Sequence, residues 1–211
     1  MSDILYLLAL FTFQLFIIVN PFATIPVYLS LTKSNTYKQR VKIALTASLV
    51  STIVLIFFGI FGNLLVGSLG IGLNAIKIGG GLLLLITGMN MVYGKFAGSK
   101  ISDKEHSIAA KMEDISVTPL AIPLLSGPGA ITTVLIFSNT NTSFLSSGVL
   151  VLGVILVGLS SYLLLRYAGV VNKFIGEIGM NTLGKVFGMI WVFLSTEIII
   201  QGLTAVLTSA I

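Results

Sequence analysis

The chain has 211 residues, of which 55% are hydrophobic and 9% charged, and it carries a formal net charge of +5. This composition is too apolar and too poor in charge for an ordinary soluble domain, and it indicates an integral membrane protein. The chain has no cysteine, which excludes disulfides, thiolate metal sites and a cysteine nucleophile.

Long charge-free runs define the predicted membrane spans. At about 20 residues per span, and with the longest runs divided at their Gly, Asn and Ser clusters, six helices fit. We predict them near residues 4–32, 43–66, 76–94, 117–138, 148–166 and 184–207. The expected fold class is therefore an all-α membrane protein in a lipid bilayer.

The first predicted helix is interrupted near its centre. Asn20 and Pro21 lie inside the uncharged run 4–32, and proline removes a backbone donor and clashes with the preceding turn. In hydrocarbon, the freed carbonyl groups cannot turn to the lipid. We expect the helix to stop here and to resume as a half-helix that ends near Thr32.

The second predicted helix is uninterrupted and is assigned a scaffolding role. The third opens with Lys77 and three consecutive glycines at 79–81, which predict the close approach of another helix. The charged segment that follows contains a capping-box pattern from Ser102 to Glu105 and predicts a short cytoplasmic helix that ends near Met112.

The fourth predicted helix is broken by the run Ser126-Gly127-Pro128-Gly129. Pro21 and Pro128 are 107 residues apart, which indicates an internal repeat. We divide the single transmembrane domain, 1–211, into a first repeat at 1–94, a cytoplasmic linker at 95–116 and a second repeat at 117–211. Three helices per repeat give the repeats inverted topology, with the first helix of each broken near the midplane.

Basic residues predict the orientation. Eleven of the twelve Lys and Arg residues lie in or beside the first, third and fifth predicted loops, and only Lys77 lies on the other side. By the positive-inside rule these loops are cytoplasmic and both termini are outside. Topology thus accounts for the positive charge, and we expect no nucleic-acid partner.

The two breaks predict a binding site at the repeat interface. Each half-helix that restarts after its proline offers unpaired N–H groups to a carboxylate, and each half-helix that stops offers carbonyl groups to an ammonium group. Small residues leave little room, so a small zwitterionic amino acid fits. The candidate residues are Asn20, Pro21, Thr24, Ser126, Gly127, Gly129, Ala130, Thr132 and Thr133. The alternative is a pair of proline kinks satisfied by neighbouring Ser or Thr side chains.

Glu197 is the only acidic residue inside a predicted span. A carboxyl group at that depth usually faces a cavity or a partner, and Glu197 is the candidate for ion or proton coupling. A structural hydrogen bond from a protonated acid, or a position nearer the interface, is the alternative.

Three segments resemble the MarC family of integral membrane proteins: NPFATIPVYLSLT at 20–32, PLAIPLLSGPGAI at 119–131, and the glycine run from Lys77 to Gly81. The resemblance covers essentially the whole chain. It implies a six-helix protein of the prokaryotic inner membrane that transports small neutral amino acids such as glycine and alanine, with proton-linked transport.

We therefore expect secondary active transport of a small neutral amino acid by alternating access, with H⁺ as the coupling ion and Na⁺ as the alternative. A small-solute or ion channel, or a structural membrane protein without transport activity, are the other functions considered. No enzyme activity is expected, because the single histidine, His106, lies in a loop and leaves Ser126 without an imidazole base. We expect no cofactor and no metal.

Overall fold

The structure, a computed structural model, describes residues 2–94 and 115–209, and the regular elements in these ranges are all helices. In chain order they are α1 (Ser2–Val19), α2 (Pro21–Leu31), α3 (Tyr37–Ser68), α4 (Leu73–Val92), η1 (Ser116–Leu125), α6 (Pro128–Thr140), α7 (Phe144–Arg166) and α8 (Ala168–Ser209). The short helix predicted at 102–112 lies outside the described residues.

Within these ranges, five helical stretches are long and apolar enough to cross a membrane. They are Asp3–Leu31, Tyr37–Ser68, Leu73–Val92, Phe144–Arg166 and Ile178–Thr208. η1 and α6 meet at a bend of 56° and make a sixth if they are counted as one span. Each predicted range overlaps one of these stretches, so the all-helical membrane fold is confirmed.

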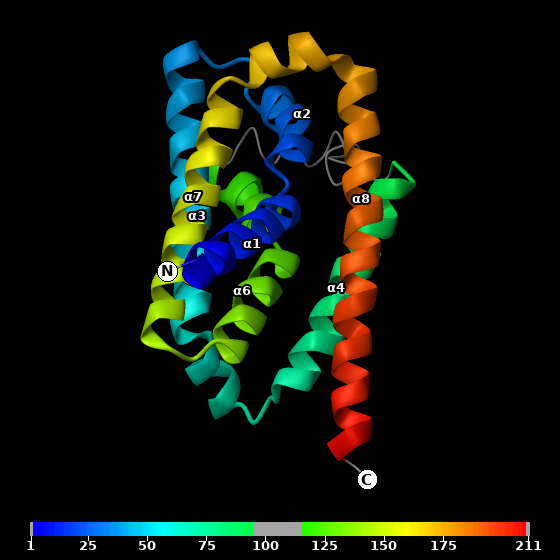
Figure 1. The fold of residues 1–211 in the computed structure, drawn as a ribbon. Helices are drawn as coiled ribbons and strands as arrows, with labels where there is room; N and C mark the ends of the chain where they lie inside the picture. The colour runs from blue at the N-terminus through cyan, green and yellow to red at the C-terminus, as the bar shows by residue number, and fades with distance from the viewer. Residues whose placement is uncertain (1, 95–114, 210–211) are drawn as a thin grey trace.

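The predicted connection between the fifth and sixth spans is present at residues 167–177, but it is mostly helical and not an irregular loop. α8 begins at Ala168, with only Tyr167 between it and the end of α7, and stays helical except at Gly176, where φ is 75°. That angle suits glycine, which lacks the Cβ that makes it costly for other residues. The part of α8 before Gly176 lies across one end of the molecule, and the rest runs to the opposite end (Figure 1). Lys173 and its neighbours therefore belong to a surface helix. A charged residue does not end a helix by itself, and this segment contains no proline that would.

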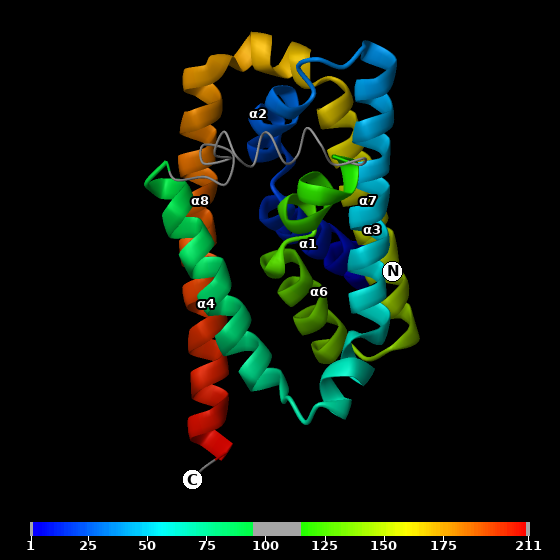
Figure 2. The same cartoon turned by 180° about the vertical axis from the view of Figure 1, so that it is seen from behind.

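The helices form two outer pairs with the interrupted segments between them. α3 packs beside α7, and α4 packs beside α8, while α1, α2, η1 and α6 lie between the pairs (Figures 1 and 2). The loops that join α2 to α3 and α7 to α8 lie at one end of the molecule, and those that join α3 to α4 and α6 to α7 at the other (Figure 1). The central segments thus lie between uninterrupted helices.

Glycines allow the close packing of α4, as the run at 79–81 predicted. A Cβ on Gly81 would lie 2.6 Å from Ile199 Cγ1 of α8, and a Cβ on Gly88 would lie 3.0 Å from the carbonyl oxygen of Gly188. At Gly80, a Cβ would overlap Thr132 of α6. Backbones this close leave no space for a side chain between them.

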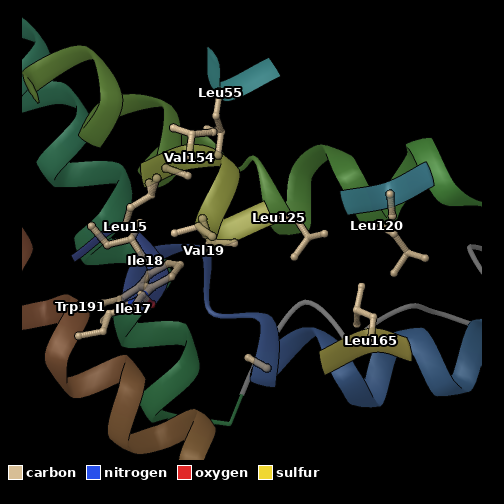
Figure 3. Packing of buried hydrophobic residues seen from close by; sticks show 14 of the residues in the cluster. Leu15, Ile17, Ile18, Val19, Leu55, Leu120, Leu125, Val154, Leu165 and Trp191 are labelled. Carbon is tan, nitrogen blue, oxygen red and sulfur yellow. The ribbon is translucent and has the colours of Figure 1, made fainter. Parts of the chain in front are cut away.

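The hydrophobic core gathers around the last turn of α1. Leu15 and Ile18 are buried there together with Leu125 of η1 and Val154 of α7 (Figure 3). Trp191 of α8 lies beside Ile17 in the same cluster (Figure 3). The core therefore lies where the interrupted segments meet the two outer pairs.

Candidate functional site

A single residue, Asn20, separates α1 from α2. Its backbone is in the left-handed region, with φ 46° and ψ 64°, which asparagine tolerates better than most residues. Its Oδ1 accepts a hydrogen bond of 3.3 Å from the Ala23 N–H and so caps α2. Pro21 follows at the first helical position, where its missing N–H costs α2 nothing. We refer to Asn20 and Pro21 as the first interruption.

Pro21 leaves an acceptor without its helical donor. In a continuous α-helix the carbonyl oxygen of Ile17 accepts from the N–H of residue 21, which proline lacks. Here the indole N–H of Trp191 on α8 donates to that oxygen, with 2.9 Å between Nε1 and O. Trp191 is buried, and Figure 3 shows it beside Ile17. A distant helix thus satisfies the carbonyl group that the first interruption frees.

The Asn20 side chain also carries an unused donor. Asn20 is 3% exposed, and its Nδ2 has no hydrogen-bond acceptor. Within the described residues only two other buried side-chain polar atoms share this state, Thr12 Oγ1 and Ser48 Oγ. Leaving a buried donor unpaired costs about 1–3 kcal/mol, so the Asn20 amide is a position where a bound acceptor would stabilise the protein.

The segment before α6 is irregular over a longer stretch than the sequence predicts. Thr118 and Ile122 are extended, with φ near −125° and ψ 120°, and each precedes a proline, which disfavours the helical region at these residues. The irregularity therefore begins well before Ser126. Both the N–H and the hydroxyl of Ser126 donate to the Ala121 carbonyl oxygen, each at 2.9 Å, so this hydroxyl is engaged by its own backbone.

The start of α6 has no side-chain cap. Its N-cap is Gly127, and a Cβ there would lie 2.5 Å from the carbonyl oxygen of Pro123, too close for any other residue. Pro128 is at the first helical position, so the first turn presents the N–H groups of Gly129 and Ala130. The Thr133 hydroxyl donates to the Gly129 carbonyl oxygen at 2.9 Å. We refer to residues 126–129 as the second interruption.

The second interruption lies against the end of α1. A Cβ on Gly129 would overlap Leu84 of α4 and would lie 3.4 Å from Cγ2 of Ile18, two residues before Asn20. Gly129 therefore allows the start of α6 to approach both α4 and the last turn of α1. Thr132, one turn further along α6, lies against Gly80 of α4.

Most of the predicted site residues are enclosed. Gly127 and Gly129 are half-buried, and the others are buried: Asn20, Pro21, Thr24, Ser126, Ala130, Thr132 and Thr133. Seven of the nine are therefore shielded from solvent, and a ligand at this position would need the surrounding helices to separate.

Glu197 is not part of this group. It lies on the exposed side of α8, where its Oε1 accepts a hydrogen bond of 2.9 Å from Nε2 of Gln201, one turn along the same helix. The coupling role of Glu197 stays a prediction, since the structure places the carboxyl group away from both interruptions.

Sequence reasoning missed two groups of polar contacts. One is the Trp191 hydrogen bond; the only signal for it is that the single tryptophan of the chain falls inside a span, away from the membrane interface where tryptophan is enriched. The other links α3 to α6: Nδ2 of Asn63 donates to Ser138 Oγ at 3.2 Å, and Nδ2 of Asn139 donates to Oδ1 of Asn63.

Comparison with known proteins identifies the family. The family model described as "MarC family integral membrane protein" matches residues 5–207. A UPF0056 membrane protein of Methanocaldococcus jannaschii is 34% identical over 93% of this chain and 86% of its own length, and a second from that organism is 34% identical over 97% and 99%. A UPF0056 membrane protein of Aquifex aeolicus is 32% identical over 90% of this chain and 89% of its own length. No solved structure matches the chain. The protein whose interrupted helices are described above belongs to the MarC family of integral membrane proteins.

Proposed function

We propose that this protein is a secondary active transporter of small neutral amino acids, of the size of glycine and alanine, that works by alternating access with proton coupling. The observation that carries the proposal is how close the second interruption lies to the end of α1: Gly129, in the first turn of α6, lies against Ile18, two residues before Asn20. Two half-helices that each begin with a proline therefore start close together inside a membrane bundle.

The groups at these starts suit a zwitterion. The uncapped N–H groups of Gly129 and Ala130 and the positive end of the α6 dipole favour a carboxylate, and the unpaired Asn20 Nδ2 adds a neutral donor. Carbonyl groups at the end of α1, that of Ile17 among them, suit the ammonium group. The glycines and Ala130 leave room for a small side chain only, which favours glycine and alanine over larger amino acids.

The packing of the helices supports two inverted repeats at 1–94 and 117–211. α4 packs on α6 as α8 packs on α2, and α3 packs on η1 as α7 packs on α1. The outer pairs join equivalent helices of the two repeats, α3 with α7 and α4 with α8. The glycines do not repeat in the same way, because Gly80 lies against Thr132 whereas Gly188 lies against Gly88 and Met91. In the proposed cycle, the two repeats rock about the buried site.

The proposed location is the prokaryotic cytoplasmic membrane, with both termini outside. The loop from α2 to α3 carries Lys33 and is followed by Lys38, Arg40 and Lys42, whereas residues 69–72 and 141–143 at the other end of the molecule carry no charge. This asymmetry supports a cytoplasmic location for the basic end. Glu197 with its Gln201 partner is the proposed carrier of the coupling proton.

Uptake of radiolabelled glycine and alanine into proteoliposomes tests the proposal, with an imposed proton gradient, a sodium gradient or no gradient, and with protein-free liposomes as the control. We expect saturable accumulation with the proton gradient only. Accumulation with sodium alone would keep the carrier and replace the coupling ion. Flux that does not saturate and follows any gradient would identify a channel, and no uptake by folded, inserted protein would refute the substrate class.

A further inference from the structure

We propose that Trp191 sets the affinity for the substrate by competing with the substrate's ammonium group for the carbonyl oxygen of Ile17. This inference rests on the function proposed above and adds a residue that the sequence did not single out. Its basis is the 2.9 Å hydrogen bond from the Trp191 indole to an oxygen that Pro21 has deprived of its helical donor.

The Ile17 oxygen is a suitable point of competition. It lies one turn before Pro21, next to Ile18, which contacts the start of α6. An amino acid whose carboxylate sits at Gly129 and Ala130 therefore has its ammonium group directed toward the end of α1. While the indole N–H occupies the Ile17 oxygen, the substrate must displace it to gain that acceptor. The described arrangement is then the closed form of the site, in agreement with the burial of Trp191 at 9% exposure.

The same contact connects the site to a helix pair. Trp191 lies on α8, and its Cβ would lie 2.9 Å from a Cβ built on Gly88 of α4, so the indole is anchored within the α4–α8 pair. One turn earlier on α8, the ring of Phe187 stacks on Phe22 of α2, with 6.2 Å between ring centroids. Displacing the indole would break the hydrogen bond between α8 and the last turn of α1, so that substrate binding favours separation of the α4–α8 pair from α1 and α2.

The first test uses the wild-type protein. Trp191 is the only tryptophan in the chain, so intrinsic tryptophan fluorescence reports on this one contact. The reconstituted protein is titrated with glycine, and with N-acetylglycine, which keeps the carboxylate but has no ammonium group. We expect a saturable change in emission with glycine, at concentrations that match the KM of uptake, and no such change with N-acetylglycine.

The second test is Trp191→Phe, which removes the N–H and keeps an aromatic ring. With the competing donor gone, the binding-competent form is more populated, and the KM for glycine falls by roughly 2- to 12-fold, the factor expected for one hydrogen bond. A purely structural role predicts less folded protein with an unchanged or higher KM, so the direction of the KM change separates the two readings. Size-exclusion chromatography confirms that the variant is folded.

The outcomes distinguish this inference from the proposed function. Suppose that the wild type takes up glycine, that its emission does not change with glycine, and that Trp191→Phe has an unchanged or raised KM. This result would overturn the competition but would agree with the proposed transport function. An equal emission change with N-acetylglycine would also overturn it, because the ammonium group would then not be what displaces the indole. Failure of wild-type uptake together with a silent emission would refute both.

Discussion

The left-handed backbone of Asn20 allows stability and transport to be separated by two substitutions at one position. Asn20 both adopts φ 46° and caps α2 through Oδ1, while its Nδ2 is buried without a partner. Asn20→Ala removes the side-chain amide and places a residue with a Cβ in a conformation that it disfavours. Asn20→Gly removes the same amide but has no Cβ and adopts this conformation freely.

The expected magnitudes differ for the two variants. Loss of an N-cap to alanine costs about 0.5–2 kcal/mol, and to glycine a few tenths of a kcal/mol. Holding alanine in the left-handed region costs roughly 1–2 kcal/mol more. Asn20→Ala is therefore destabilised by about 1.5–4 kcal/mol, whereas Asn20→Gly stays within about 0.5 kcal/mol of the wild type.

Thermal unfolding in detergent, followed by circular dichroism, measures the stability, and glycine uptake measures the transport. We expect the melting temperature of Asn20→Ala to fall by roughly 3–16 °C and that of Asn20→Gly to change little. Both variants should lose transport to a similar degree, because both lack the Nδ2 donor. Equal stability of the two variants would refute the backbone argument, and normal uptake by Asn20→Gly would remove Nδ2 from the site.

Three further substitutions, one of them with a matched control variant, test other parts of the molecule. Gly129→Ala should lower glycine uptake at least about tenfold, because the start of α6 can no longer approach Leu84 and α1 so closely; Gly148→Ala, whose Cβ would meet nothing within 4 Å, is the matched control and should transport normally. Glu197→Gln should abolish accumulation driven by the proton gradient while exchange of labelled for unlabelled glycine persists, and normal accumulation would exclude Glu197 as the coupling residue. Tyr28→Phe removes the 2.8 Å hydrogen bond from the Tyr28 hydroxyl to the Arg40 carbonyl oxygen and should cost about 1 kcal/mol in thermal unfolding with the KM unchanged.

The membrane spans could be predicted because the length of an apolar run reflects the thickness of the bilayer rather than the details of packing. Close helix contact at Gly80 and Gly81 was predictable for a similar reason, since glycines in membrane helices commonly allow another helix to approach. The irregular stretch before α6 also has a local sequence signal, because Pro119 and Pro123 each disfavour the helical region at the residue before them.

Other features depend on which helices become neighbours, and no local pattern contains that information. Pro21 predicts that the Ile17 carbonyl group loses its donor, but not that an indole 174 residues away replaces it. The side of α8 on which Glu197 lies follows from the packing of Gly88 against Gly188, a long-range contact. Burial of Thr132 against Gly80 likewise needs the position of α6 relative to α4.

The links between the outer helix pairs have a mechanical consequence. α8 is joined to α7 through Tyr167 at one end of the molecule, and α4 is joined to α3 through residues 69–72 at the opposite end (Figure 1). The α4–α8 pair is thus connected to the α3–α7 pair by one short link at each end of the molecule. The portion of α8 after Gly176 is about 50 Å long at about 1.5 Å per residue. A tilt of this helix by roughly 5° about the link at one end therefore displaces its other end by about 4 Å. In the proposed alternating-access cycle, a small rotation about one link or the other would open the α4–α8 pair toward one side of the membrane or the other, and neither pair would have to unfold.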